Sequence, residues 1–72
     1  MKHTRTERGF FLAEGTDLYN KPFSLQRSSL VEPDAIWLGQ GEYRIHLTRE
    51  MVAEMLPLLK RFVRTGELEK RR

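Results

Sequence analysis

The spacing of apolar residues changes once along this chain, and that change constrains the fold more than any other feature. Before residue 48, apolar and polar residues alternate in residues 23–28 and 43–47, a period of two that indicates half-buried β-strands. After Thr48 apolar residues recur every three or four positions, which is the period of an α-helix. The sequence therefore predicts an α+β fold, in which a C-terminal helix covers one face of a small antiparallel sheet.

The alternating part of the chain predicts three to four short strands. They are expected at residues 9–13 and 23–28, and in a hairpin whose strands are residues 35–38 and 43–47. In the first, Phe10 and Leu12 share one face and Phe11 takes the other. In the second, Phe23 and Leu25 point one way, whereas Ser24, Gln26 and Ser28 point the other way. The segments between the strands are rich in Gly, Asn, Asp and Pro, which favour turns.

The predicted hairpin determines on which face of the sheet Trp37 lies. If Ile36 and Leu38 face the core, Trp37 lies on the outer face of the sheet, with Arg44 and His46 across from it. This prediction depends on the register, because a slip of one residue would reverse the faces. The alternative is that Trp37 packs in the core, since small domains depend strongly on their aromatic residues.

The helical part has a start signal, an end signal and an interruption. Thr48 can cap the N-terminus, Glu50 is favourable in the first turn, and Gly66 follows the last periodic residue. Pro57 lies inside the pattern, where proline removes one hydrogen bond. Because the apolar stripe keeps its phase across Pro57, we expect one helix kinked near that residue. The stripe, predicted to belong to the core, consists of Val52, Met55, Leu56, Leu59, Phe62 and Val63.

Positive charge is concentrated at the two ends of the chain. The net charge of +3 combines +2 in residues 1–8, +4 in residues 60–72 and −3 between them. Basic ends favour binding to polyanions or to acidic protein surfaces, although they also keep a small domain soluble. We interpret residues 1–8 as a flexible basic tail, residues 9–68 as a single small α+β domain and residues 69–72 as a basic C-terminal tail.

The residues that usually carry catalysis or bind metals are sparse. The chain has no cysteine, and His3 and His46 lack the spacing of a zinc site. Gly39-Gln40-Gly41 is not followed by the Lys-Ser/Thr of a phosphate-binding loop, and Ser28-Ser29 has no neighbouring base in the sequence. The sequence therefore predicts a non-enzymatic protein without cofactor or metal. The absence of a long apolar run and of a signal-peptide core predicts a cytoplasmic location.

Two groups of residues are candidates for binding. Trp and Arg contribute strongly to protein interfaces, which makes the exposed face of the hairpin a candidate protein-binding site to which the basic N-terminus adds charge. The candidate partner-binding residues are Lys2, Arg5, Arg8, Trp37, Arg44 and His46. The candidate residues facing nucleic acid are Lys60, Arg61 and Arg64.

Three stretches together resemble a family of small tailed-phage proteins. They are Phe-Ser-Leu-Gln-Arg-Ser-Ser at residues 23–29, Ala-Ile-Trp-Leu-Gly at residues 35–39, and a third that runs from Arg-Ile-His-Leu-Thr-Arg-Glu at residues 44–50 through Leu-Pro-Leu-Leu to Phe-Val-Arg-Thr-Gly-Glu-Leu at residues 62–68. The similarity covers roughly residues 9–68, and Pro57 fits the pattern. The length and the basic ends look like a small phage-encoded regulator that binds host bacterial RNA polymerase.

The resemblance implies a function in host takeover. Such a regulator is expected to inhibit initiation by displacing σ and to promote antitermination near the RNA exit channel. Its implied partners are the β′ N-terminal region and the β flap, with the elongation factor NusA assisting and nascent RNA nearby. We expect a monomer in the host bacterial cytoplasm. The alternatives are a non-specific nucleic-acid-binding protein and a structural or assembly component of a phage particle, which would form a symmetric oligomer.

Overall fold

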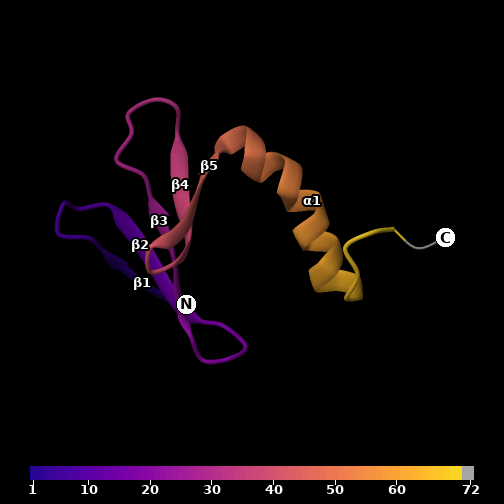
Figure 1. Cartoon of the computed structure of the whole chain (residues 1–72). Helices are drawn as coiled ribbons and strands as arrows, with labels where there is room; N and C mark the ends of the chain where they lie inside the picture. The colour runs from indigo at the N-terminus through magenta and orange to yellow at the C-terminus, as the bar shows by residue number, and fades with distance from the viewer. Residues whose placement is uncertain (71–72) are drawn as a thin grey trace.

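Five strands precede one helix in the computed structural model, which describes residues 1–70 (Figure 1). All strand pairs are antiparallel, and the strands lie in consecutive order from β1 to β5. The α+β prediction is confirmed, but three to four strands was too few. Of the predicted C-terminal tail, residues 71 and 72 lie outside the described residues. The elements are β1 (Lys2–Arg5), β2 (Phe11–Thr16), β3 (Pro22–Arg27), β4 (Ala35–Gln40), β5 (Tyr43–Thr48) and α1 (Arg49–Thr65).

The additional strand is β1, which lies in the segment predicted to be a flexible tail. Its residues pair with β2, from Lys2 opposite Glu14 to Arg5 opposite Phe11. A turn closes the hairpin, in which the Gly9 N–H donates to the Thr6 carbonyl oxygen over 2.9 Å. The expectation of a tail is therefore wrong for residues 2–5, because pairing to β2 fixes a segment that has no apolar alternation of its own.

The register sorts the side chains of the sheet onto two faces, since paired residues share a face and neighbours along a strand alternate. The apolar face carries Phe11, Ala13, Phe23, Leu25, Ile36, Leu38, Ile45 and Leu47. The polar face carries Leu12, Glu14, Ser24, Gln26, Trp37, Arg44 and His46. The alternation predicted for residues 23–28 and for the hairpin is confirmed.

Both ends of α1 are capped by the residues that the sequence indicates. The Thr48 side chain accepts a hydrogen bond from the Met51 N–H over 3.3 Å. At the other end Gly66 takes a positive φ of 79° and donates its N–H to the Phe62 carbonyl oxygen over 2.8 Å. The helix runs continuously across Pro57, which confirms the prediction of one helix rather than two.

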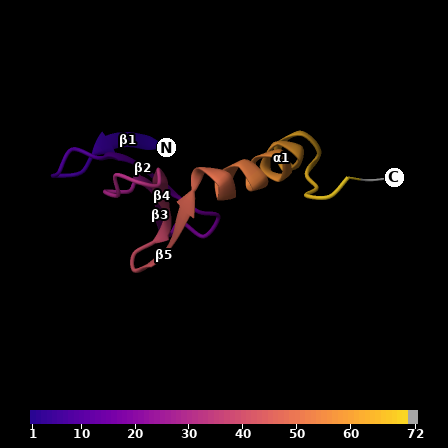
Figure 2. The same cartoon turned by 90° about the horizontal axis from the view of Figure 1, so that it is seen from above.

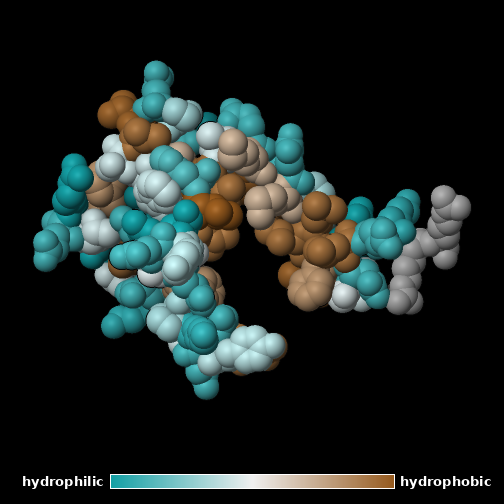
Figure 3. Space-filling model, in the orientation of Figure 1, coloured by the Kyte–Doolittle hydropathy of each residue, from teal (hydrophilic) through white to brown (hydrophobic). Residues whose placement is uncertain are grey.

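The helix does not cover the sheet, and this part of the fold prediction is wrong. The helix projects away from the sheet, and the space-filling view shows a hollow between them (Figures 1, 2 and 3). The reason is the connection: β5 ends at Thr48 and α1 begins at Arg49. A helix that folds back onto its own sheet needs a connecting loop, typically of about 2–6 residues, and this chain has none there.

The chain consequently buries little of its apolar surface. Among residues 1–70, only Ala13, Ala35 and Ser28 are almost fully buried, with exposures of 3%, 4% and 2%. The apolar stripe of α1, predicted as core, is exposed or only half-buried. The radius of gyration is 14.0 Å, compared with about 11 Å for a compact domain of this length.

Candidate protein-binding site

Trp37 and His46 form a stacked pair on the polar face of the sheet. They lie directly opposite one another in the β4–β5 register. Their ring centroids are 3.9 Å apart and the ring planes differ by 5°. Trp37 is partly buried and His46 is exposed. The sequence prediction that Trp37 lies on the outer face with His46 across from it is therefore confirmed.

Arg44 extends this pair along β5. Its Cζ lies 5.2 Å from the centroid of the Trp37 ring, which is within the range of a cation–π interaction. Its Nη1 also donates to the Gln26 Oε1 atom over 3.3 Å. The cation–π contact and the hydrogen bond to Gln26 together hold the Arg44 guanidinium beside the Trp37 indole, although Arg44 is exposed.

Ser28 contacts His46, the histidine of the stacked pair. The sequence alone did not connect these two residues. The His46 Nε2 atom lies 2.9 Å from the Ser28 Oγ atom, which also accepts a hydrogen bond from the Leu30 N–H over 3.2 Å. The two residues are 18 positions apart. Their shared polar face was the only available signal, because Ser28 and His46 both alternate outward from the predicted core.

A serine bonded to a histidine is the geometry of an activated nucleophile, but the setting here favours a structural role. Ser28 is 2% exposed, so its hydroxyl does not reach the surface where a substrate would sit. The imidazole of His46 is already packed against Trp37. The hydroxyl therefore fixes the ring orientation of His46 and, through it, the position of Trp37.

Two glycines determine the turn that aligns this group. Gly41 has a φ of 53° at the first position of the two-residue turn between β4 and β5, as a type II′ hairpin turn requires. Gly39 lies opposite Arg44, and a Cβ atom there would clash with the Tyr43 carbonyl oxygen and lie 2.7 Å from the Arg44 Cα atom.

We call Trp37, His46, Arg44, Gln26 and Ser28 the Trp37 cluster.

The structure does not bring the basic N-terminal residues to the Trp37 cluster. Strand β1 forms the edge opposite β5. Lys2 shares the polar face but lies beyond β2 and β3. The Arg5 Nη1 atom donates to the Gly9 carbonyl oxygen over 3.0 Å, and the Arg8 Cζ atom lies 5.7 Å from the Phe10 ring centroid. These two arginines belong to the β1–β2 hairpin.

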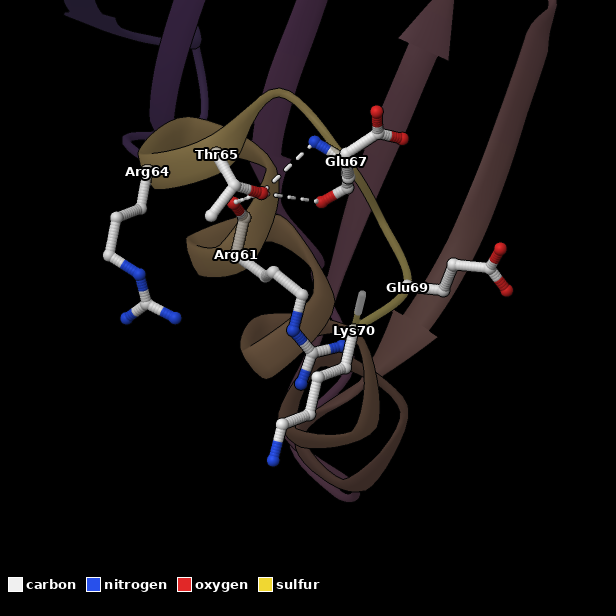
Figure 4. Close-up of a pocket in the computed structure, with 6 residues that line it drawn as sticks. All are labelled: Arg61, Arg64, Thr65, Glu67, Glu69 and Lys70. Carbon is white, nitrogen blue, oxygen red and sulfur yellow. Dashed lines mark hydrogen bonds between the residues drawn. The ribbon is translucent and has the colours of Figure 1, made fainter. Parts of the chain in front are cut away.

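The basic residues near the end of α1 surround a pocket of mixed charge (Figure 4). Arg61 donates from Nη1 to the Leu68 carbonyl oxygen over 3.0 Å, and the Thr65 hydroxyl donates to the Arg61 carbonyl oxygen. Figure 4 shows Arg64 and Glu69 pointing to opposite sides. Because the carboxylates of Glu67 and Glu69 line the pocket together with the basic side chains, the charge of the pocket does not select for a phosphate group. The lining residues are Arg61, Arg64, Thr65, Glu67, Glu69 and Lys70.

Two aspartates brace the loops around the sheet, and both have a lowered pKa. Backbone N–H donation from Lys21, with help from Tyr19 and the Gln40 amide, lowers the pKa of Asp17. A hydrogen bond from Arg27 over 2.7 Å, together with the charges of Arg27 and Arg49, lowers the pKa of Asp34. Asp34 thereby links β3 to the first residue of α1.

Comparisons with known proteins find no match to this chain. No family model matches the chain, and neither does any curated protein or solved structure. Within residues 1–70, no three His, Asp or Glu side chains gather as a metal site would require. The same residues contain no helix long and apolar enough to cross a membrane.

Proposed function

We propose that this chain is a protein-binding regulator that attaches to bacterial RNA polymerase through the Trp37 cluster. The observation that carries the proposal is the Trp37–His46 stack on the polar face of the sheet. Trp and Arg are the residue types that most often dominate binding energy at interfaces, and here they lie side by side.

The cluster is also pre-organised, which favours tight binding. Stacking and the bond to Ser28 restrict His46, and the bond to Gln26 restricts Arg44. Ordering a flexible side chain on binding costs about 0.5–1.5 kcal/mol. Because His46 and Arg44 are already restricted in the free protein, less side-chain entropy is lost on binding, and more of the contact energy contributes to affinity.

RNA polymerase is the proposed target because of the sequence resemblance to small tailed-phage proteins. Under this proposal the chain displaces σ from the polymerase and promotes antitermination, with contacts at the β′ N-terminal region and the β flap and with NusA assisting. Lys60 and Arg64, which are exposed and one helical turn apart on α1, would face nascent RNA. The N-terminal Lys2 lies on the same face as the cluster, opposite Glu14 of β2.

The proposal is tested by co-migration of the purified protein with RNA polymerase core and holoenzyme on native gels at physiological salt. We expect binding to core and loss of σ from holoenzyme. Trp37→Ala should weaken binding by about 10-fold or more, and Arg44→Gln should weaken it to a smaller extent.

The matched control is Tyr19→Ala, which removes an exposed aromatic ring from the β2–β3 loop and leaves the cluster intact. Circular dichroism confirms that each variant is folded. Failure of the folded protein to bind either form of the polymerase would contradict the choice of target. Equal binding by the Trp37→Ala and wild-type proteins would contradict the choice of surface.

A further inference from the structure

The helix α1 presents a continuous apolar face that its own chain leaves open. At 3.6 residues per turn its apolar residues fall on one side and its charged residues on the other. Phe62 is 54% exposed and Val63 is 85% exposed. The helix face, as we call it, consists of Met51, Val52, Met55, Leu56, Leu58, Leu59, Phe62 and Val63.

At Val52 and Leu56 the helix face borders a groove whose opposite wall belongs to the apolar face of the sheet. The apolar residues that line the inner end of the groove, which we call its floor, are Ile36 and Leu47 of the sheet and Val52, Ala53 and Leu56 of the helix. The charged residues Arg27, Asp34 and Arg49 line the same groove. Hydrophobic side chains line both sides of the hollow (Figure 3). Farther from the floor the two faces diverge, and Ile45 and Phe11 on the sheet are exposed. Two apolar surfaces thus face the same open space.

The surface area shows how much of the chain remains to be covered. The chain exposes 6506 Å², about 1,800 Å² more than the roughly 4,700 Å² expected for a compact monomer of this size. That excess is more than twice the roughly 800 Å² that one partner contributes to a standard interface. The unburied surface is therefore large enough for a stable interface.

Within residues 1–70, no segment of the chain fills the groove (Figure 3). The direct junction of Thr48 and Arg49 keeps α1 off its own sheet. A helix with the required apolar face is nevertheless present in every copy, as is an uncovered sheet.

We propose that the groove is occupied by a second copy of this chain, in a two-fold symmetric dimer in which each helix face packs on the apolar face of the partner's sheet. Such an interface is isologous: each copy gives a helix and receives one, so both contacts form together and no open surface is left to propagate. The proposal concerns the opposite side of the sheet from the Trp37 cluster and is independent of the proposed function. It replaces the monomer expected from the sequence.

Sedimentation equilibrium or light scattering over a range of concentrations tests the proposal. The wild-type protein should have twice the mass of one chain. Leu59→Gln/Phe62→Gln, on the helix face, should weaken dimerisation by about 100-fold or more, because four large apolar side chains per dimer lose burial. The matched control Lys60→Gln/Arg64→Gln introduces the same residue twice on the charged side of α1 and should leave the dimer intact.

A mixing experiment tests the reciprocal arrangement. Ile45→Gln should weaken the dimer by damaging the sheet side of both contacts. Mixed with the Leu59→Gln/Phe62→Gln variant, it should form a heterodimer more strongly than either variant self-associates, because one helix-on-sheet contact is then undamaged. Circular dichroism verifies that the variants remain folded.

Several outcomes would overturn the proposal. One is a wild-type monomer at high concentration, and another is a dimer that both Gln pairs affect equally. A dimer sensitive to the helix variant but not to Ile45→Gln would show helix-to-helix pairing instead. A monomer whose polymerase binding is lost in the helix-face variant would assign the groove to the polymerase, without affecting the test of Trp37.

Discussion

The two faces of the sheet differ in how far this chain completes them. On the polar face, the indole, imidazole, guanidinium and hydroxyl groups of the Trp37 cluster contact one another. On the apolar face, Ile45 and Phe11 remain exposed. The helix α1, whose apolar side chains could cover such residues, projects away from the sheet (Figure 2). Both faces belong to the same five strands, so the difference does not arise from strand formation.

The difference shows that short-range order and burial are separate requirements. Side-chain contacts between neighbouring strands complete the polar face without a second layer, because stacking and hydrogen bonding need only an adjacent strand. Apolar side chains need an opposing layer to leave water, and no neighbouring strand supplies one. The polar face is thus ordered within a single copy, whereas the apolar face remains open to solvent.

The largest effect on stability is expected from a substitution that disturbs the pairing of β4 with β5, because both faces of the sheet depend on that pairing. Gly39→Ala places a Cβ against the Tyr43 carbonyl oxygen, at a φ of 155° that favours glycine. We expect a loss of at least about 2 kcal/mol in the free energy of unfolding, measured by urea denaturation. Gly41→Ala, whose Cβ would meet open space, should cost only about 1 kcal/mol. Equal losses in the two variants would show that the close approach at Gly39 is unimportant.

Adjacent residues of β3 compare the faces directly. Leu25→Ala removes a half-buried side chain from the apolar face, and Ser24→Ala changes the polar face. We expect a loss of about 1–2 kcal/mol for Leu25→Ala and a change within about 0.5 kcal/mol for Ser24→Ala. If a second copy covers the apolar face, the Leu25→Ala loss should grow with protein concentration. A similar loss in both variants would contradict the distinction between the faces.

Within the polar face, Ser28→Ala tests whether the hydroxyl holds the stack. We expect a loss of about 1 kcal/mol and a change in Trp37 fluorescence, because His46 loses the partner that fixes its ring. Ser29→Ala alters the exposed neighbouring serine and serves as the control. An unchanged fluorescence spectrum in Ser28→Ala would mean that stacking alone orders the pair.

The smallest effect is expected at Asp34, which links β3 to α1. Its pKa is lower in the folded protein than its ordinary value of 3.8, chiefly because of the hydrogen bond from Arg27. The unfolded chain therefore binds a proton more readily, so the interaction stabilises the fold above pH 3.8 and is lost as the pH falls further. Asp34→Asn should flatten the decline in unfolding free energy below pH 3.8. A decline as steep as that of the wild type would exclude this contribution.

The local features of the fold could be predicted from the sequence. Period-two alternation placed Trp37 opposite His46, and the three-to-four spacing, Thr48 and Gly66 gave the helix with both caps. Each of these features depends on residues close together in the chain, where steric and hydrogen-bonding preferences act directly.

The features that depend on distant pairing could not be predicted in the same way. Strand β1 has no apolar alternation and exists because β2 supplies partners for it. The Ser28–His46 contact crosses from the end of β3 to β5. The apolar stripe of α1 indicates that something must cover it, but the stripe itself does not identify the covering surface.

The consecutive order of the strands also sets how the backbone resists opening. Among the strands of residues 1–70, the inner ones bond to a neighbour on each side, whereas β1 and β5 pair on one side only. With so few side chains fully buried, amide exchange with solvent should follow position across the sheet: slowest in β3, faster in β2 and β4, and fastest at the two edges. The chain should therefore loosen from its edges inward, so that Gln26 keeps its backbone bonds longer than Lys2 or Tyr43.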